Sequence, residues 1–174
     1  MIALGGVHGQ AGVLRWSAEM EGSKGPRLRR ARRADIPQIE ALLAAEGLPP
    51  FQVREFLETF WALEQDGRVV GAAGLEAYGE AGVLRSVVVD PSLRGTRQGR
   101  RLVDVALAEA RQRGVKQLYL FTMHAAPFFA RSGFEACSME DFVPEARQSW
   151  QWQALSMRPE IANQLTPMRL ELIE

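Results

Sequence analysis

Arginines and glycines are concentrated between residues 94 and 101, directly after an apolar, β-branched run. That run stops at Asp90-Pro91, and beyond residue 98 apolar residues recur at helical spacing, so the pattern predicts a strand, a loop and a helix in succession. A loop of this kind directs free backbone N–H groups and the positive end of a helix at one point, which suits a phosphate group. The competing P-loop pattern fails because no Gly-Lys-Ser/Thr follows. The candidate phosphate-binding residues are Arg94, Gly95, Thr96, Arg97, Gln98, Gly99 and Arg100.

The elements after this loop predict a βαβ crossover. An apolar stripe runs from Leu102 to Ala110, and Gly114 ends the helix. The apolar run from Lys116 to Met123 suits a buried strand parallel to the strand before the loop. Residues 83–123 are therefore expected to form one right-handed crossover unit.

Before the loop, the pattern predicts an antiparallel meander. Asp66-Gly67 separates two apolar runs, which is the strongest short-range signal for a hairpin, and a second turn leads into the strand ending at Val89. An edge strand is expected at Leu28–Arg32, followed by a helix from Asp35, as its N-cap, to Gly47 and a short helix at Phe51–Leu57.

After the crossover, a short helix is expected at Ala125–Ser132, a strand at Phe134–Phe142, a last strand at Trp150–Met157 and a helix or tail at Pro159–Glu174. The fold class is α+β, with a mixed, mostly antiparallel central sheet, one parallel βαβ crossover and flanking helices. We expect a flexible extension at 1–26, one domain at 27–157 and a C-terminal tail or helix at 158–174.

Composition excludes several classes of function. The chain has 174 residues and 21 residues of each charge sign, so net charge indicates neither a nucleic-acid nor a membrane partner. One cysteine and two separated histidines predict no metal site and no internal disulfide. The basic segment from Lys24 to Arg33 is interpreted as a solvated face, with an anion or nucleic-acid contact as the alternative. Because the N-terminus lacks a secretory pattern and no run reaches the length of a membrane span, we expect a cytoplasmic protein.

Two motifs in this order resemble the GNAT acyl-CoA N-acyltransferases. The loop from Arg94 to Gly99 is similar to that family's Arg/Gln-x-x-Gly-x-Gly/Ala motif, and Phe128-Phe129-Ala130-Arg131-Ser132-Gly133-Phe134 to its Phe-Tyr-x-x-x-Gly-Phe motif. The resemblance implies that acetyl-CoA is a co-substrate. Backbone groups of Val87, Val88 and Val89 would pair with its pantetheine, and the loop would hold the pyrophosphate. Gly74-Leu75-Glu76, Leu84-Arg85-Ser86 and the strand near Thr122 are similar to an arsenic-resistance-associated subgroup of N-acetyltransferases.

The chain departs from the family pattern at two positions. Arg97 stands where the family has glycine; a left-handed backbone there would cost arginine roughly 1 kcal/mol. Phe129, which the resemblance implies as a cofactor contact, stands where many relatives have a proton-donating tyrosine, so the general acid would lie elsewhere, be water or be unnecessary.

The proposed reaction is direct attack of a small-molecule primary amine on the thioester in a ternary complex. Glu76 is the candidate base and His124 the candidate replacement for the tyrosine, while Arg85, Ser86 and Thr122 are candidate acceptor-binding residues. The alternative is a non-catalytic acyl-CoA-binding or regulatory domain. A homodimer is left open as a further arrangement.

Overall fold

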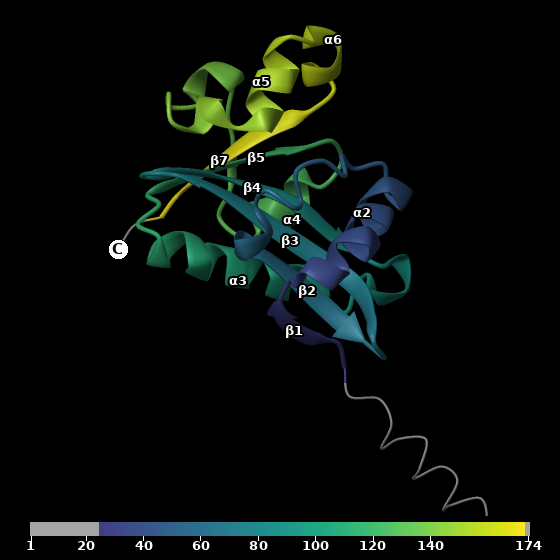
Figure 1. Ribbon diagram of the computed structural model, residues 1–174. Helices are drawn as coiled ribbons and strands as arrows, with labels where there is room; N and C mark the ends of the chain where they lie inside the picture. The colour runs from purple at the N-terminus through teal and green to yellow at the C-terminus, as the bar shows by residue number, and fades with distance from the viewer. Residues whose placement is uncertain (1–24, 173–174) are drawn as a thin grey trace, which may run out of the picture.

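The computed structural model describes residues 25–172. Seven strands form one sheet in the order β1-β2-β3-β4-β5-β7-β6 (Figure 1). The strands are β1 (Arg27–Arg30), β2 (Phe60–Gln65), β3 (Arg68–Tyr78), β4 (Ala81–Val89), β5 (Gln117–Thr122), β6 (Glu135–Ala136) and β7 (Thr166–Glu171).

The predicted α+β fold class is confirmed. Strands β1 to β4 form the antiparallel meander, and β4 and β5 are the one parallel pair within residues 25–172. Helix α3 (Gln98–Gln112) connects them, as the crossover requires. Both remaining pairs, β5 with β7 and β7 with β6, are antiparallel.

The helices cover both faces of the sheet. Helix α3 and α4 (Ala126–Ala130) pack on one face, where Leu75 and Leu84 contact the buried side of α3. Helix α2 (Ile36–Ala45) packs on the opposite face against β2 and β3. Beside α2 on that face lies the segment with α5 (Trp150–Ser156) and α6 (Pro159–Ala162), seen in yellow-green in Figure 1. Because side chains alternate along a strand, Glu76 and Arg85 point to the face opposite α3.

Three local predictions between residues 51 and 157 were wrong. Residues 51–57 form turns rather than a helix, and only a 3₁₀ turn, Leu57–Thr59, follows. Trp150–Met157 was predicted as a strand, but Ser149 accepts a hydrogen bond from the Trp152 amide and thereby caps helix α5. The predicted strand at Phe134–Phe142 is two residues long, because Ser138 and Asp141 form a capping box that begins a 3₁₀ turn.

The expected tail or helix at residues 158–174 is confirmed only for Pro159–Ala162, which form helix α6, and the rest of this prediction is the largest error. Residues 166–171 are instead strand β7, which enters the sheet between β5 and β6. Its pairing partners lie more than thirty residues earlier, so local periodicity carried no signal for this position. The expected N-terminal extension lies outside the described residues, except for Gly25 and Pro26.

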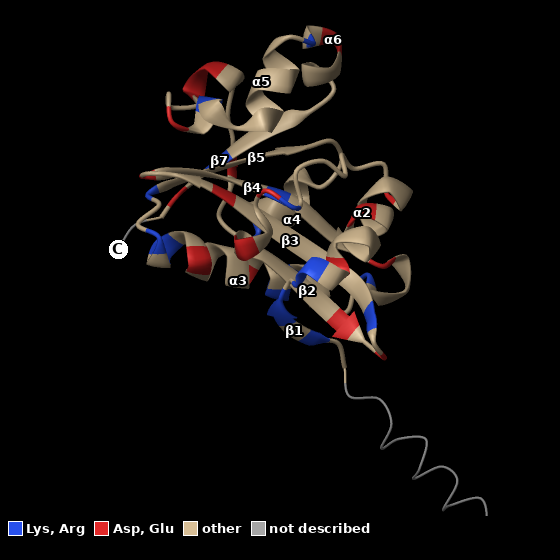
Figure 2. Cartoon of the chain, viewed as in Figure 1, with Lys and Arg blue, Asp and Glu red and all other residues tan. Residues whose placement is uncertain are grey.

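The basic segment before residue 34 is not simply a solvated face. Figure 2 shows basic residues along β1 next to acidic residues on neighbouring elements. Arg29 pairs with Asp35 and Glu64, both at 2.6 Å, and Arg30 pairs with Glu109 and lies 4.2 Å from the Trp61 ring centre. These two arginines join β1 to the rest of the domain.

Asp35 is also placed differently from the prediction. Its side chain caps no α2 amide but accepts hydrogen bonds from Arg29 and from the Arg32 amide. The Arg29 hydrogen bond lowers the pKa of Asp35 below its ordinary value of 3.8.

Candidate active site

The parallel strands β4 and β5 separate after three residue pairs. Ala81, Gly82 and Val83 pair with β5, whereas residues 84–89 of β4 have no β5 partner among the described residues. On its other side β4 pairs with β3 almost to its end, through Gly71 and Val89. One edge of β4 therefore stays open for an extended ligand, and this edge includes Val87, Val88 and Val89, the predicted pantetheine-binding residues.

A β-bulge lies at this opening. The register between β3 and β4 shifts between Ala72 and Gly74, and Ser86 adopts φ +56°, which is uncommon for a non-glycine residue. Bulges bend a strand and redirect its backbone groups, and they are common beside active sites. Ser86 and Val87 are half-buried here, while Val88 is buried against the α2 side of the sheet.

The loop after β4 has the backbone that an anion site requires. Asp90 receives hydrogen bonds from the amide and hydroxyl of Ser92, and these bonds lower its pKa. Gly95 and Arg97 both have positive φ, +75° and +67°, and Arg97 occupies the N-cap position of α3. The left-handed conformation explains the family glycine at position 97.

The first amides of α3 are available to a ligand. Within residues 25–172, the N–H groups of Gln98, Gly99 and Arg100 donate no hydrogen bond, and no side chain caps the helix. A Cβ at Gly99 would lie 3.2 Å from the Phe128 ring, so backbone and ring approach closely there. The loop therefore fits a phosphate group. The contact between Gly99 and Phe128 also brings together the two motifs that resemble the family, residues 94–99 and 128–134.

The loop arginines differ in their partners. Arg94 pairs with Glu46, and Arg100 pairs with Asp104 at 2.7 Å and donates to the Arg131 carbonyl at 2.9 Å. Arg97 is exposed, and its guanidinium forms no hydrogen bond or ion pair with the described residues, although its backbone carbonyl accepts from the Arg101 amide. Its charge is thus available to an anion.

Glu76 and Arg85 form an ion pair with no solvent exposure. Arg85 Nη1 donates to Glu76 Oε1 at 2.7 Å, and the side chains are both 0% exposed. The second carboxylate oxygen of Glu76 accepts from the Tyr78 hydroxyl at 2.6 Å. Burial and this hydrogen bond raise the pKa of Tyr78, so that its hydroxyl remains a donor. The pairing of Glu76 with Arg85 that the sequence suggested is present in the structure.

The other donors of Arg85 reach neighbouring segments. Its Nε donates to Ser86 Oγ at 3.2 Å, and its Nη2 donates to the Phe51 carbonyl. Since Arg85 is the second residue beyond the last β4–β5 pair, this cluster lies where the strands begin to separate.

The remaining candidates are not brought together with this pair. Thr122 Oγ1 accepts from the Ala125 amide at 3.0 Å, which gives it a capping function at the turn into α4. His124 is exposed and makes no hydrogen bond with the described residues. Phe129 is 8% exposed and packs with Phe128 and Phe134, with ring centres at 5.0 and 6.0 Å.

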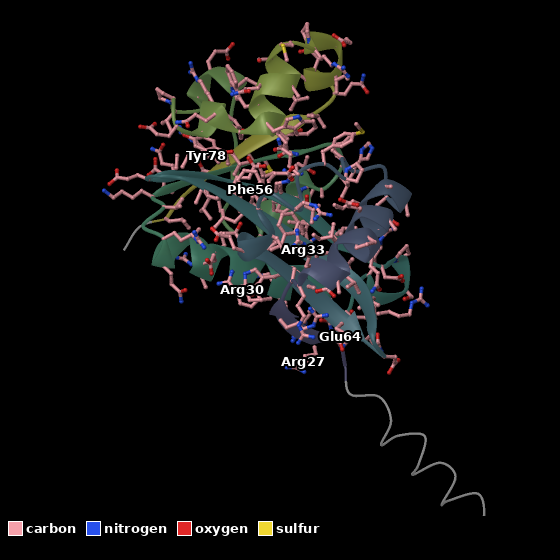
Figure 3. The ribbon with its side chains drawn as sticks, in the orientation of Figure 1. Arg27, Arg30, Arg33, Phe56, Glu64 and Tyr78 are labelled. Carbon is pink, nitrogen blue, oxygen red and sulfur yellow. The ribbon has the colours of Figure 1, made fainter. Side chains whose placement is uncertain are left out.

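Sequence reasoning missed three contributors, namely Tyr78, the Phe51 carbonyl and the Phe128 ring. Tyr78 had a usable signal, because residues two apart on a strand share a face. Figure 3 shows Tyr78 at the far end of the sheet from Glu64 and Arg27. The Phe51 carbonyl had no signal, since a backbone acceptor in a loop carries no residue type.

Residues 25–172 hold neither a cluster of metal-binding side chains nor a helix suited to a membrane. They contain no group of three or more His, Cys, Asp or Glu side chains placed to hold a metal ion. None of their helices has the length and apolar character that crossing a membrane requires.

Comparison with known sequences relates the chain to amino-acid acetyltransferases. A Neisseria meningitidis amino-acid acetyltransferase is 34% identical over 130 residues, which are 70% of this chain but 30% of that protein. The Mycobacterium tuberculosis amino-acid acetyltransferase is 33% identical over 121 residues, 63% of this chain and 68% of that protein. The chain thus spans less than a third of the length of the Neisseria relative and about two thirds of the mycobacterial one.

Two solved structures have a fold similar to that of this chain. The Mycobacterium tuberculosis protein Rv2747, solved with CoA and a second ligand, has a TM-score of 0.74 and 27% identity, covering 85% of this chain and 100% of that one. The N-acetylglutamate synthase of Neisseria gonorrhoeae, complexed with coenzyme A and N-acetyl-glutamate, has a TM-score of 0.71 and 22% identity, covering 87% of this chain and 36% of that one. The sequence profile of the Acetyltransferase (GNAT) family matches residues 28–134, from β1 through the crossover to Phe134. By this match, and by the open β4 edge and the arginine loop that it includes, the chain belongs to the GNAT acetyltransferase family.

Proposed function

We propose that this chain is an N-acetyltransferase that moves the acetyl group of acetyl-CoA to the primary amine of a small, amino-acid-like molecule. The observation that carries the proposal is the open edge of β4 over residues 84–89, which leads directly into a loop with free amides and an unpaired arginine. The pantetheine arm of CoA is extended and ends in a pyrophosphate. It therefore requires a free strand edge followed by an anion site. The names of the relatives support an amino acid as the acceptor.

The residues that would hold acetyl-CoA lie along one path. Backbone groups of Val87 and Val89 would pair with the pantetheine arm, and the amides of Gln98 and Gly99, with the Arg97 guanidinium, would bind the pyrophosphate. The co-substrate supplies an activated thioester with a thiolate leaving group, and a thiol of this kind has a reference pKa near ~8.5. Backbone N–H groups at the bulge would polarise the thioester carbonyl.

The acceptor amine must lose a proton, because an alkyl amine has a reference pKa near ~10.4. The base role of Glu76 stays a prediction. Both of its carboxylate oxygens are engaged by Arg85 and Tyr78, so direct contact with an amine would require one of these hydrogen bonds to open. The exposed His124 stays a second candidate, for protonation of the leaving thiolate.

The test is a thiol-release assay with acetyl-CoA and a panel of amino acids, amino-acid antibiotics and polyamines, together with calorimetric titration of acetyl-CoA. We expect binding, and thiol release with at least one amino-acid-like amine. If acetyl-CoA does not bind, the proposal fails. The variant Glu76→Gln then tests the base: lost turnover with unchanged acetyl-CoA affinity and folded protein supports the role, and unchanged turnover removes it.

A second candidate function is a non-catalytic acyl-CoA-binding domain. The observation that favours it is Phe129, which is packed in the core and has no proton to donate. Binding of acetyl-CoA without thiol release across the whole panel would select this alternative.

A further inference from the structure

We propose that Arg85 is a positioning residue, which fixes the loop at Phe51 and Gln52 over the sheet and thereby forms the acceptor side of the site. The inference rests on the proposed function for its link to the acceptor. Its structural part is independent of that function.

Arg85 is engaged inside the protein by three partners. Its guanidinium is fully buried, and its charge is compensated by Glu76 at 2.7 Å. The rest of its fork donates to Ser86 Oγ and to the Phe51 carbonyl. A guanidinium held in this way connects β3, β4 and the segment after α2 at one point.

The loop that Arg85 holds has a constrained backbone. Within the described residues, Gln52 is one of four non-glycine residues with positive φ, at +60°, and such a conformation persists only where the surroundings impose it. Val53 next to it is fully buried against α2, whereas the Phe51 side chain is 56% exposed. One end of the loop is thus fixed by Val53 in the core, and the Arg85 bond fixes the adjoining residue at its exposed end.

The Phe51 side chain connects this loop with α5. The Phe51 ring meets the Trp150 ring edge-on, with centres 5.4 Å apart and planes at 63°. Trp150 begins helix α5, whose N-cap Ser149 is fully buried. Arg85 therefore fixes Phe51, whose ring contacts Trp150, the first residue of α5.

These contacts lie beside the open edge of β4. Arg85 immediately precedes the bulge residue Ser86, and both belong to the part of β4 that lacks a β5 partner. A molecule attacking a thioester placed at this edge would approach next to Phe51 and Trp150. The structure assigns their rings to the wall on the acceptor side, where an aromatic pair suits the apolar part of an acceptor side chain.

The variant Arg85→Lys tests the tether. A lysine ammonium can pair with Glu76 but cannot reproduce the planar fork that also reaches the Phe51 carbonyl. We expect amide hydrogen exchange in residues 48–57 to accelerate about tenfold or more, while the core of the sheet stays protected. Arg29→Lys is the matched control, since it alters a paired arginine on β1 and should leave exchange in residues 48–57 unchanged.

The kinetic readout separates positioning from general destabilisation. We expect Arg85→Lys to raise KM for the acceptor about tenfold and to leave KM for acetyl-CoA within about twofold of wild type. Equal changes in both KM values, or unchanged exchange in residues 48–57, would overturn the proposal. If the wild-type protein acetylates no amine, the proposed function fails, and the exchange experiment still decides whether the tether exists.

Amino-acid carboxamides as acceptors and the variant Phe51→Ala provide two further measurements. If Arg85 instead bound an acceptor carboxylate directly, Arg85→Lys would raise KM for amino acids but not for their carboxamides; positioning predicts the same factor for both. Should Arg85→Lys fail to fold, Phe51→Ala retains the carbonyl and removes only the ring. It should then raise KM for the acceptor and accelerate exchange in residues 150–156, and unchanged values for both would refute the link to α5.

Discussion

The arginine at position 85 and the arginines of the 94–101 loop belong to the same candidate site, yet their surroundings are opposite. Arg85 and Glu76 are 0% exposed and hydrogen-bonded to each other and to three further groups, the Tyr78 hydroxyl, Ser86 Oγ and the Phe51 carbonyl. In the loop, Arg94 is 59% exposed in its pair with Glu46. A buried charge must be compensated inside the protein, whereas an exposed one is hydrated and remains free to bind a ligand. Residue type alone therefore does not tell a structural arginine from a binding arginine.

The largest effect should come from breaking the buried pair. Glu76→Ala leaves the Arg85 charge buried without its partner, and we expect the free energy of unfolding to fall by about 3–5 kcal/mol. Urea denaturation measures this. Glu46→Ala, which removes the partner of exposed Arg94, is the control and should cost less than about 1 kcal/mol. Equal losses in the two variants would remove the contrast between the regions.

A third ion pair, between Arg29 and Asp35, extends the comparison to the edge of the sheet. The Asp35 pKa is lowered in the folded protein, so its contribution is complete above the ordinary value of 3.8 and is lost as pH falls through the lower folded value. We expect Asp35→Asn to reduce stability by about 2 kcal/mol at neutral pH and progressively less below pH 3.8. Denaturation curves between neutral and strongly acidic pH check the sign; a difference that grows as pH falls would contradict it.

The loop should respond in binding rather than in stability. Arg97→Gln removes a charge that no described residue compensates, and we expect acetyl-CoA to bind about tenfold more weakly, as for one lost charge-assisted hydrogen bond. The salt dependence of binding should also become shallower. Calorimetry at two salt concentrations measures both.

The control for this charge is Arg111→Gln at the other end of α3. Fifteen helical residues span about 20 Å, well beyond the screening length at physiological salt, so binding should be unchanged. Equal weakening in both variants would mean that only net charge matters.

The smallest effect is expected for Arg97→Gly. Glycine removes the strain of the left-handed backbone at φ +67°, which stabilises the folded protein. It also gives the unfolded chain more conformational entropy, which destabilises the folded protein, and these two effects of about 1 kcal/mol each nearly cancel. Thermal denaturation should show a stability change under about 0.5 kcal/mol. A loss of more than about 1 kcal/mol would show that the Arg97 side chain stabilises the loop.

Predictions from the sequence were reliable where the signal was continuous along the chain. The hairpin turn at Asp66-Gly67, the stripe of α3 and the loop between Arg94 and Gly99 each lie within a few residues, and all of them occur as predicted. The pairing of Glu76 with Arg85 was also found, because a charged residue in an apolar strand requires a partner of opposite charge.

Predictions failed where remote residues decide the local structure. Residues 51–57 do not form a helix, and the Phe51 carbonyl instead accepts from Arg85. A strand was expected at Trp150–Met157, yet the buried Ser149 caps a helix there. The Asp35 carboxylate, expected to cap α2, binds Arg29 of the edge strand.

The sequence by itself determined the family, the fold class and the succession of strand, arginine-rich loop and helix around residues 94–101, because a strand, a loop and a helix that follow one another encode their geometry locally. Only the tertiary structure decided that β7 enters the sheet between β5 and β6, that the β1 arginines are paired internally and that Arg85 holds the loop at Phe51. Each of these depends on pairing between distant segments, and neither residue type nor periodicity specifies which distant group a buried donor will reach.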